Sequence, residues 1–152
     1  MTPEEKLKEL GLSLPNVPVP VANYLPAVRA GNLVFISGQS CVDDGKLLYT
    51  GKVGGELTLE EGYDAAKQAA INCLAILKKE LGELSRVKRI VKLFGLVNSA
   101  PGFNQQPRVI NGASDLLVEV FGEKGRHARS AVGTSELPFD IPVEVEMIVE
   151  VE

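Results

Sequence analysis

The chain has 152 residues, of which 45% are hydrophobic, and its formal net charge is -4. This length and apolar content are typical of one folded domain and exclude an intrinsically disordered chain. The acidic balance makes nucleic acid an unfavoured partner, because phosphate binding needs a concentrated basic surface. No apolar run approaches the ~20 residues that a membrane span needs, so no membrane partner is expected.

The chain offers little for metal or disulfide chemistry. Its two cysteines, Cys41 and Cys73, have no CxxC or metal-ligand spacing, and its single histidine is His127. We therefore expect two reduced thiols and no metal site. The N-terminal segment MTPEEKLKEL is acidic and amphipathic, which is unlike a signal or transit peptide. These features predict a cytoplasmic protein.

Two capping boxes mark the starts of helices, one at Thr2 and one at Thr58. The first predicts a short helix over residues 3–10. The second opens a long helix with an alanine-rich apolar stripe that ends before Gly82, which indicates close packing onto a sheet. A third amphipathic helix is predicted over residues 107–121.

Strands are predicted from apolar runs that are bounded by glycine and proline. The expected strands are 21–29, 33–39, 46–51, 87–98, a strand that opens at Arg129, and a strand that follows Pro142. A proline-rich arm over 12–26 leads into the first of them. This order predicts one domain over residues 1–152, with 1–16 as an N-terminal helix and extension. The expected fold is α+β, a mixed six-stranded sheet with two helices on one face. A Val- and Ile-rich open face usually packs against a ligand or against copies of itself.

The segment 127–152 places a lone arginine before a strand of alternating valine and glutamate. Pro138 and Pro142 separate the strand of Arg129 from the last strand, in which Glu144 points away from the valines. If the two strands are antiparallel neighbours, one sheet carries both a guanidinium and a carboxylate. Such a pair could hold a small anionic substrate beside a proton-transfer group. The same pattern also fits a salt-bridged, solvated sheet face.

With its elements in this order, the chain resembles the YjgF/RidA family, once called "endoribonuclease L-PSP" proteins. The resemblance covers about residues 17–152. It rests on NYLPAVRAGNLVFISGQ (23–39), on 51–93, and on HARSAVGTSELP followed by the acidic strand. It implies a chorismate-mutase-like fold and a homotrimer with three sites in clefts between subunits. It also implies cofactor-free hydrolysis of reactive 2-imino acids to 2-oxo acids and ammonia.

The resemblance assigns roles by position. Arg129 matches the arginine that binds the substrate carboxylate, and Glu144 matches the glutamate that orients or activates water. Tyr24 matches a tyrosine that lines the cleft, and Gly38 matches a glycine whose backbone approaches the ligand. Ala131 stands where deaminases typically carry cysteine, so this position can offer its backbone N–H but no thiol.

Other departures place the chain in a divergent branch. The deaminase helix motif VNxxYxxFF is replaced by VINGASDLLVEVFG, which brings Ser114 near the family asparagine. GRHAR replaces a proline-containing approach to the arginine and introduces His127, which could act as a base or be a structural histidine.

The resemblance and the departures from it leave three possible functions. The first is a deaminase of the 2-iminobutanoate/2-iminopropanoate type. The second is a non-catalytic or regulatory protein that binds 2-oxo acids in the same cleft, which Ala131 and the altered helix favour. The third is a ribonuclease or translation inhibitor, which an acidic chain with one histidine supports least.

Overall fold

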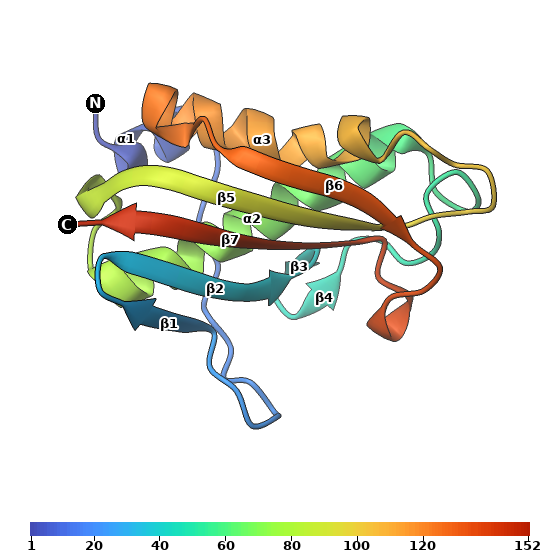
Figure 1. Cartoon of the computed structure of the whole chain (residues 1–152), viewed down its shortest axis with the longest axis horizontal. Coiled ribbons are helices and arrows are strands. Elements are labelled where there is room, and N and C mark those ends of the chain that lie inside the picture. Colours follow the sequence, from blue (N-terminus) through green and yellow to red (C-terminus); the bar gives the residue numbers. More distant parts are fainter.

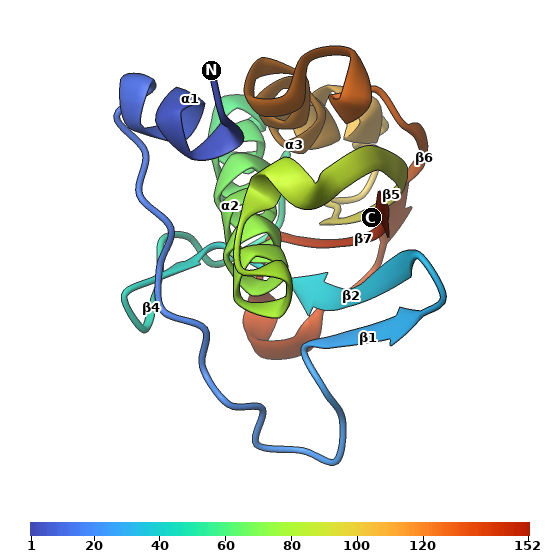
Figure 2. The same ribbon diagram turned by 90° about the vertical axis from the view of Figure 1, so that its left-hand side faces the viewer.

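The computed structural model describes all residues 1–152. The main sheet contains β1 (Ala27–Ala30), β2 (Leu33–Gln39), β5 (Val87–Asn98), β6 (Ala128–Thr134) and β7 (Val143–Val151). The helices are α1 (Pro3–Glu9), α2 (Leu59–Leu81) and α3 (Gln106–Phe121). Short 3-10 turns cover Leu84–Arg86, Gly122–Gly125 and Pro138–Asp140. The strand order is β1-β2-β7-β5-β6, and the helices lie together on one side of this sheet (Figures 1 and 2).

The capping boxes form as the sequence predicts. At the start of α2, Thr58 Oγ accepts from the Glu61 amide at 3.1 Å, and Glu61 Oε1 accepts from the Thr58 amide at 2.9 Å. Gly82 ends the helix with a φ of 86°. The two long helices cross closely because Gly112 of α3 has no side chain. A Cβ there would overlap the carbonyl oxygen of Tyr63.

The hydrophobic core lies between the sheet and the helices. The strand β7 shows the predicted alternation, because its odd-numbered residues face the core and are at most 2% exposed. Its glutamates and Ile148 lie on the opposite face, which no element of the chain covers. Phe35 of β2 and Val132 of β6 lie on that face, and each is 42% exposed. We call this surface the open face. None of the helices is long and apolar enough to cross a membrane.

The predicted six-stranded sheet is wrong, because the main sheet has five strands. The segment expected as a strand over 46–51 contributes only β4 (Lys46–Leu47), which pairs with β3 (Val42–Asp43) in a separate hairpin. Beyond β4 the chain turns toward α2, where the Tyr49 hydroxyl donates to Asp64 at 2.9 Å. The first strand also begins later than predicted, at Ala27, directly after a proline that cannot donate to a sheet.

The last two strands are not the neighbours that the sequence suggested. The strand β5 lies between β6 and β7, parallel to β6 and antiparallel to β7 (Figure 1). The connection from β6 to β7 passes the end of β5, where the buried Asn98 holds it. Asn98 Nδ2 donates to Asp140 Oδ1 at 3.0 Å and to the Ile141 carbonyl at 3.2 Å. This crossing sets the positions of the candidate site residues.

Candidate functional site

Glu144 of β7 and Gly38 of β2 meet on the open face. A Cβ placed on Gly38 would lie 2.8 Å from the carboxyl carbon of Glu144 and 2.9 Å from its Oε1. The β2–β7 pairing shifts register between Ile36 and Gln39, and this irregularity brings Gly38 under the glutamate. Burial of Glu144, and then the negative charge of Glu146, raise the pKa of Glu144 above its ordinary value. A carboxylate with a raised pKa is suited to accept a proton.

Tyr24 belongs to a bend that is tied to the same end of β2. Ser37 Oγ donates to the Leu25 carbonyl at 2.7 Å, and the Ser37 amide donates to the Pro26 carbonyl at 2.8 Å. The Tyr24 side chain is 58% exposed rather than wedged beneath the loop. Tyr24 is therefore available to a ligand or a second copy near the strand end that carries Gly38.

Arg129 lies on the other face of the sheet. In the β5–β6 register it pairs with Leu93, which is fully buried under the helices. Glu144 pairs with Leu96, three residues along β5 and therefore on the opposite face. The guanidinium of Arg129 and the carboxylate of Glu144 consequently cannot converge within one chain.

Arg129 instead joins a cluster between β6 and α3. Its Nη1 donates to Ser114 Oγ at 3.0 Å, and its Nη2 donates to the Pro107 carbonyl at 3.2 Å. Ser114 Oγ lies 2.9 Å from His127 Nε2, and His127 Nδ1 lies 2.6 Å from the Gly125 carbonyl oxygen. The structure thus brings together three residues that the sequence singled out. They line one surface groove.

The charge state of His127 follows from its surroundings. Burial of the imidazole lowers the pKa of His127, and the positive charge of Arg129 lowers it further, while the hydrogen bond to Gly125 acts in the opposite direction. The pKa therefore lies below the ordinary histidine value, and the ring is neutral at physiological pH.

Ala131 lies on β6 on the same face as Arg129 and pairs with Gly95. Its methyl group is partly buried and packs against the core. Only the backbone of Ala131 is therefore left for a ligand. The strand β6 is at the edge of the sheet, so the amides along one of its sides have no strand partner.

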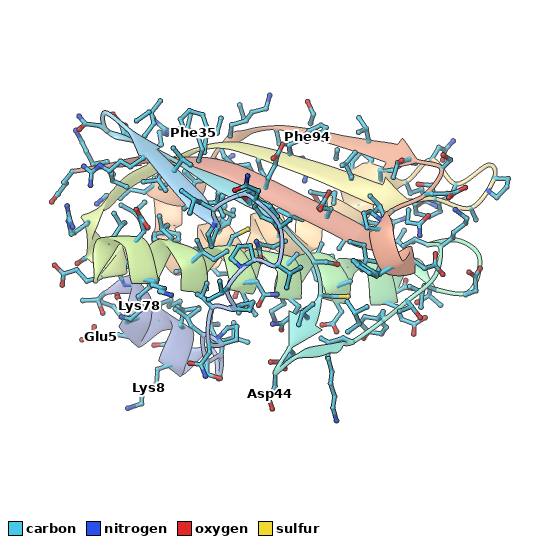
Figure 3. The ribbon with its side chains drawn as sticks, turned by 90° about the horizontal axis from the view of Figure 1, so that it is seen from below. Glu5, Lys8, Phe35, Asp44, Lys78 and Phe94 are labelled. Atoms are coloured by element: carbon cyan, nitrogen blue, oxygen red, sulfur yellow. The ribbon has the colours of Figure 1, made fainter.

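The open face combines apolar side chains with a few charges. Phe35 and Phe94 both project from it, away from the helices (Figure 3). Between them lies a shallow pocket of about 130 Å³, which Lys92, Glu146 and Ile148 also line. No cluster of three or more His, Cys, Asp or Glu side chains is arranged to hold a metal ion.

Sequence reasoning missed two kinds of contributor. The carbonyls of Pro107 and Gly125 anchor Arg129 and His127, and no side-chain pattern could have marked them. Glu146 influences the pKa of Glu144 across the face of one strand. The alternation of glutamates along this strand was a visible signal for that second effect.

Comparison with known proteins agrees with this fold. Residues 4–151 match the family model described as "YjgF/chorismate_mutase-like, putative endoribonuclease". The chain is 46% identical over 145 residues to Protein TCP17 of Trypanosoma cruzi, covering 95% of this chain and 91% of that protein. It is 31% identical over 141 residues to a protein of Dermatophagoides farinae named 2-iminobutanoate/2-iminopropanoate deaminase, covering 93% and 95%. A solved "putative endoribonuclease" from Shewanella oneidensis MR-1 superposes with a TM-score of 0.96 at 40% identity, covering 99% and 100%.

The fold and the matched region define a chorismate-mutase-like α+β domain. The chain belongs to the YjgF/RidA family. The match includes the N-terminal helix from residue 4 onward.

Proposed function

We propose that the protein hydrolyses small 2-imino acids to 2-oxo acids and ammonia, without a cofactor, in a cleft between two copies of the chain. The observation that carries this proposal is the placement of Arg129 and Glu144 on opposite faces of one sheet. Each residue has a defined local environment, but neither can complete a site alone. The name of the Dermatophagoides farinae relative, a 2-iminobutanoate/2-iminopropanoate deaminase, supports the reaction class.

The assembly follows from this division of the site. The edge strand β6 of one copy brings Arg129 to the open face of the next copy, beside its Gly38 and Glu144. Such a contact is head-to-tail, because it uses a different surface of each partner, and it closes into a ring. A homotrimer with three equivalent clefts would bury the exposed Phe35 and Val132.

In this cleft the residues divide the chemistry between them. Arg129 holds the substrate carboxylate with paired N–H donors, which a lysine could not imitate. Glu144 accepts a proton from water as the water oxygen forms a bond to C2 and the C=N bond becomes single. Glu144 returns this proton to nitrogen, which completes a tetrahedral intermediate with a hydroxyl and an amino group on C2. The hydroxyl then loses its proton, through Glu144, to the amino nitrogen, the C–N bond breaks, and ammonia leaves as the C=O bond of the 2-oxo acid forms. Tyr24 closes the cleft, and Gly38 leaves room for the ligand beside Glu144.

A second candidate function is binding of 2-oxo acids without turnover. It is favoured by Ala131, which supplies no thiol, and by the docking of the Arg129 guanidinium on α3 through two hydrogen bonds. Both functions need Arg129, so the two are separated only by a measurement of turnover.

The test couples an amino-acid oxidase, which generates 2-imino acids in place, to semicarbazide as a competing trap. Wild type should lower semicarbazone formation, Arg129→Ala should abolish the effect, and Arg129→Lys should retain little of it. Arg108→Ala is the matched control, because it removes an exposed arginine of α3 with the same change of charge. Full activity in Arg129→Ala would falsify the site. Arg129-dependent binding of 2-oxobutanoate by an inactive wild type would establish the binding function instead.

A further inference from the structure

The hydrogen bonds around His127 have one consistent direction. A carbonyl oxygen only accepts, so the 2.6 Å contact to Gly125 O places the hydrogen of the neutral ring on Nδ1. His127 Nε2 is then an acceptor, and Ser114 must donate its only hydrogen across the 2.9 Å contact. The lone pairs of Ser114 Oγ accept from Arg129 Nη1 at 3.0 Å. The chain of donors therefore runs from Arg129 through Ser114 and His127 to Gly125.

We propose that Ser114 and His127 are positioning residues for Arg129, and that a proton taken up by His127 converts the Ser114 hydroxyl into a donor for the bound anion. Only the second half of this inference rests on the proposed function, since it requires Arg129 to bind a carboxylate.

The charge of Arg129 is left unpaired by the rest of the chain. The ion pairs of the structure are Lys6–Glu9, Lys78–Glu4 and Arg126–Glu123, and none involves Arg129. Asp115 lines the same groove, but its Oδ2 accepts from the Tyr63 hydroxyl at 2.7 Å. Arg129 is thus fixed by neutral acceptors only. Two of its five N–H donors are used on α3, and three are left for a ligand.

Protonation of His127 reverses one link of the chain. His127 Nε2 then donates to Ser114 Oγ, which accepts from both His127 and Arg129, and the serine hydrogen is free to turn into the groove. The groove gains one O–H donor and one positive charge beside Arg129. Anion binding should therefore tighten as the pH falls through the pKa of His127, which burial and Arg129 hold below the ordinary value.

Other charged groups line the same groove as the imidazole. Asp115 and Glu119 project from α3 into the groove, and Arg126 and Arg129 border it from the strand side. Glu123 pairs with Arg126 at 3.9 Å. Of these groups, Arg129 is the one whose charge opposes protonation of the ring.

The first arm of the test needs no ligand. Because the chain has one histidine, ¹⁵N-histidine NMR reports the tautomer and pKa of His127 without ambiguity. Well above the ordinary imidazole pKa of about 6.5, wild type should show the Nδ1–H tautomer. Ser114→Ala keeps the Gly125 contact that sets the tautomer but removes the hydroxyl at Nε2, so it should change the His127 pKa. Ser114→Thr, which keeps a hydroxyl on the same carbon, should restore the wild-type pKa. The positioning role of Ser114 and His127 is overturned if wild type shows the Nε2–H tautomer. It is also overturned if the spectrum of Ser114→Ala matches that of wild type.

The second arm titrates 2-oxobutanoate across the pH range in a Glu144→Gln background, which removes the other titrating carboxyl. Ser114→Ala should weaken binding by about tenfold, the loss of one hydrogen bond to a charged group. His127→Gln can accept from Ser114 but cannot be protonated, so it should retain affinity near neutral pH and lose the gain on acidification. His127→Asn, which is too short to reach Ser114, should weaken binding throughout.

The two arms separate failure of this inference from failure of the proposed function. If neither wild type nor the Glu144→Gln protein binds the carboxylate at any pH, the proposed function and the ligand half of the inference both fall, while the NMR arm still decides the positioning role. If binding occurs and His127→Gln has the same pH dependence as the parent protein, only the inference falls.

Discussion

The carboxyl group of Glu144 lies against the space that a side chain on Gly38 would occupy, so the size of residue 38 controls the position of the candidate base. A Cβ at this position would lie 2.8 Å from the carboxyl carbon. The atoms that would have to move are the far end of a flexible side chain on an open surface. The structure can therefore relieve the overlap cheaply, but only by displacing the carboxylate.

We accordingly expect Gly38→Ala to separate activity from stability. The free energy of unfolding should change by less than about 1 kcal/mol, while kcat should fall by about 100-fold because the base is displaced. Thermal melts and the semicarbazide assay measure the two effects. Gly55→Ala is the control, since the nearest atom to its Cβ would be at an ordinary 3.4 Å. A Gly38→Ala protein with normal kcat would show that the position of Glu144 does not matter.

The pH dependence of the reaction should report Glu144. Burial and the charge of Glu146 raise the pKa of Glu144, and the ionised form is the one that accepts a proton. kcat/KM should therefore rise with pH through an inflection above the ordinary glutamate value of about 4.3. Glu146→Gln removes the like charge and should move this inflection to lower pH by about half a unit. Glu150→Gln, farther along the same face, should leave the inflection in place. An inflection unmoved by Glu146→Gln would show that another group controls the profile.

If copies of the chain assemble through the open face, a charged substitution at Phe35 should reduce the mass of the assembly in solution. Phe35 is 42% exposed and lines the pocket of about 130 Å³, where it would meet the next copy (Figure 3). The Phe35→Lys chain should still fold, because the methylene groups of the lysine cover apolar surface and the carboxylate of Glu146 lies on the same face as its ammonium group. Light scattering should give three chain masses for wild type and one for Phe35→Lys, which should also be inactive. Phe139→Lys, at an 88% exposed loop residue, should stay trimeric. A monomeric wild type with full activity would overturn the shared cleft.

The helices and the faces of single strands could be predicted because local contacts define them. A capping box closes over three residues, so Thr58 and Glu61 mark the start of α2 whatever surrounds it. The alternation in β7 likewise depends on one strand only. His127 and Arg129 are two residues apart, a spacing that places side chains on one side of an extended segment, and they share one groove.

The pairing of strands could not be predicted, because it depends on distant residues. Pro138 and Pro142 mark an interruption, but neither indicates that the chain crosses the end of β5. The bond from Asn98 to Asp140 fixes that crossing, and it joins residues 42 positions apart in the sequence. For the same reason alternation placed Glu144 relative to its own strand but not relative to Arg129. The separation of the two residues on opposite faces emerges only from the register.

The packing of α1 against Leu84 and Lys78 should depend on pH, because Glu4 makes the contacts. Its Oε2 accepts from the Leu84 amide at 2.8 Å and from Lys78 Nζ at 2.9 Å. Burial would raise the pKa of Glu4, but these hydrogen bonds together outweigh burial and lower it. A carboxyl whose folded pKa is depressed stabilises the fold above its unfolded pKa, and this stabilisation is lost as the pH falls through the folded pKa. We expect Glu4→Gln to lower the free energy of unfolding by about 1 kcal/mol near neutral pH. The difference from wild type should vanish in acid.

Urea unfolding at both pH values measures this difference, and hydrogen exchange in residues 3–9 should show faster opening in the variant. Glu9→Gln is the matched control, because Glu9 pairs only with Lys6 on the exposed surface of the same helix. That pair should contribute little at either pH. Equal losses in the two variants would mean that Glu4 does not anchor the helix to the Leu84 turn.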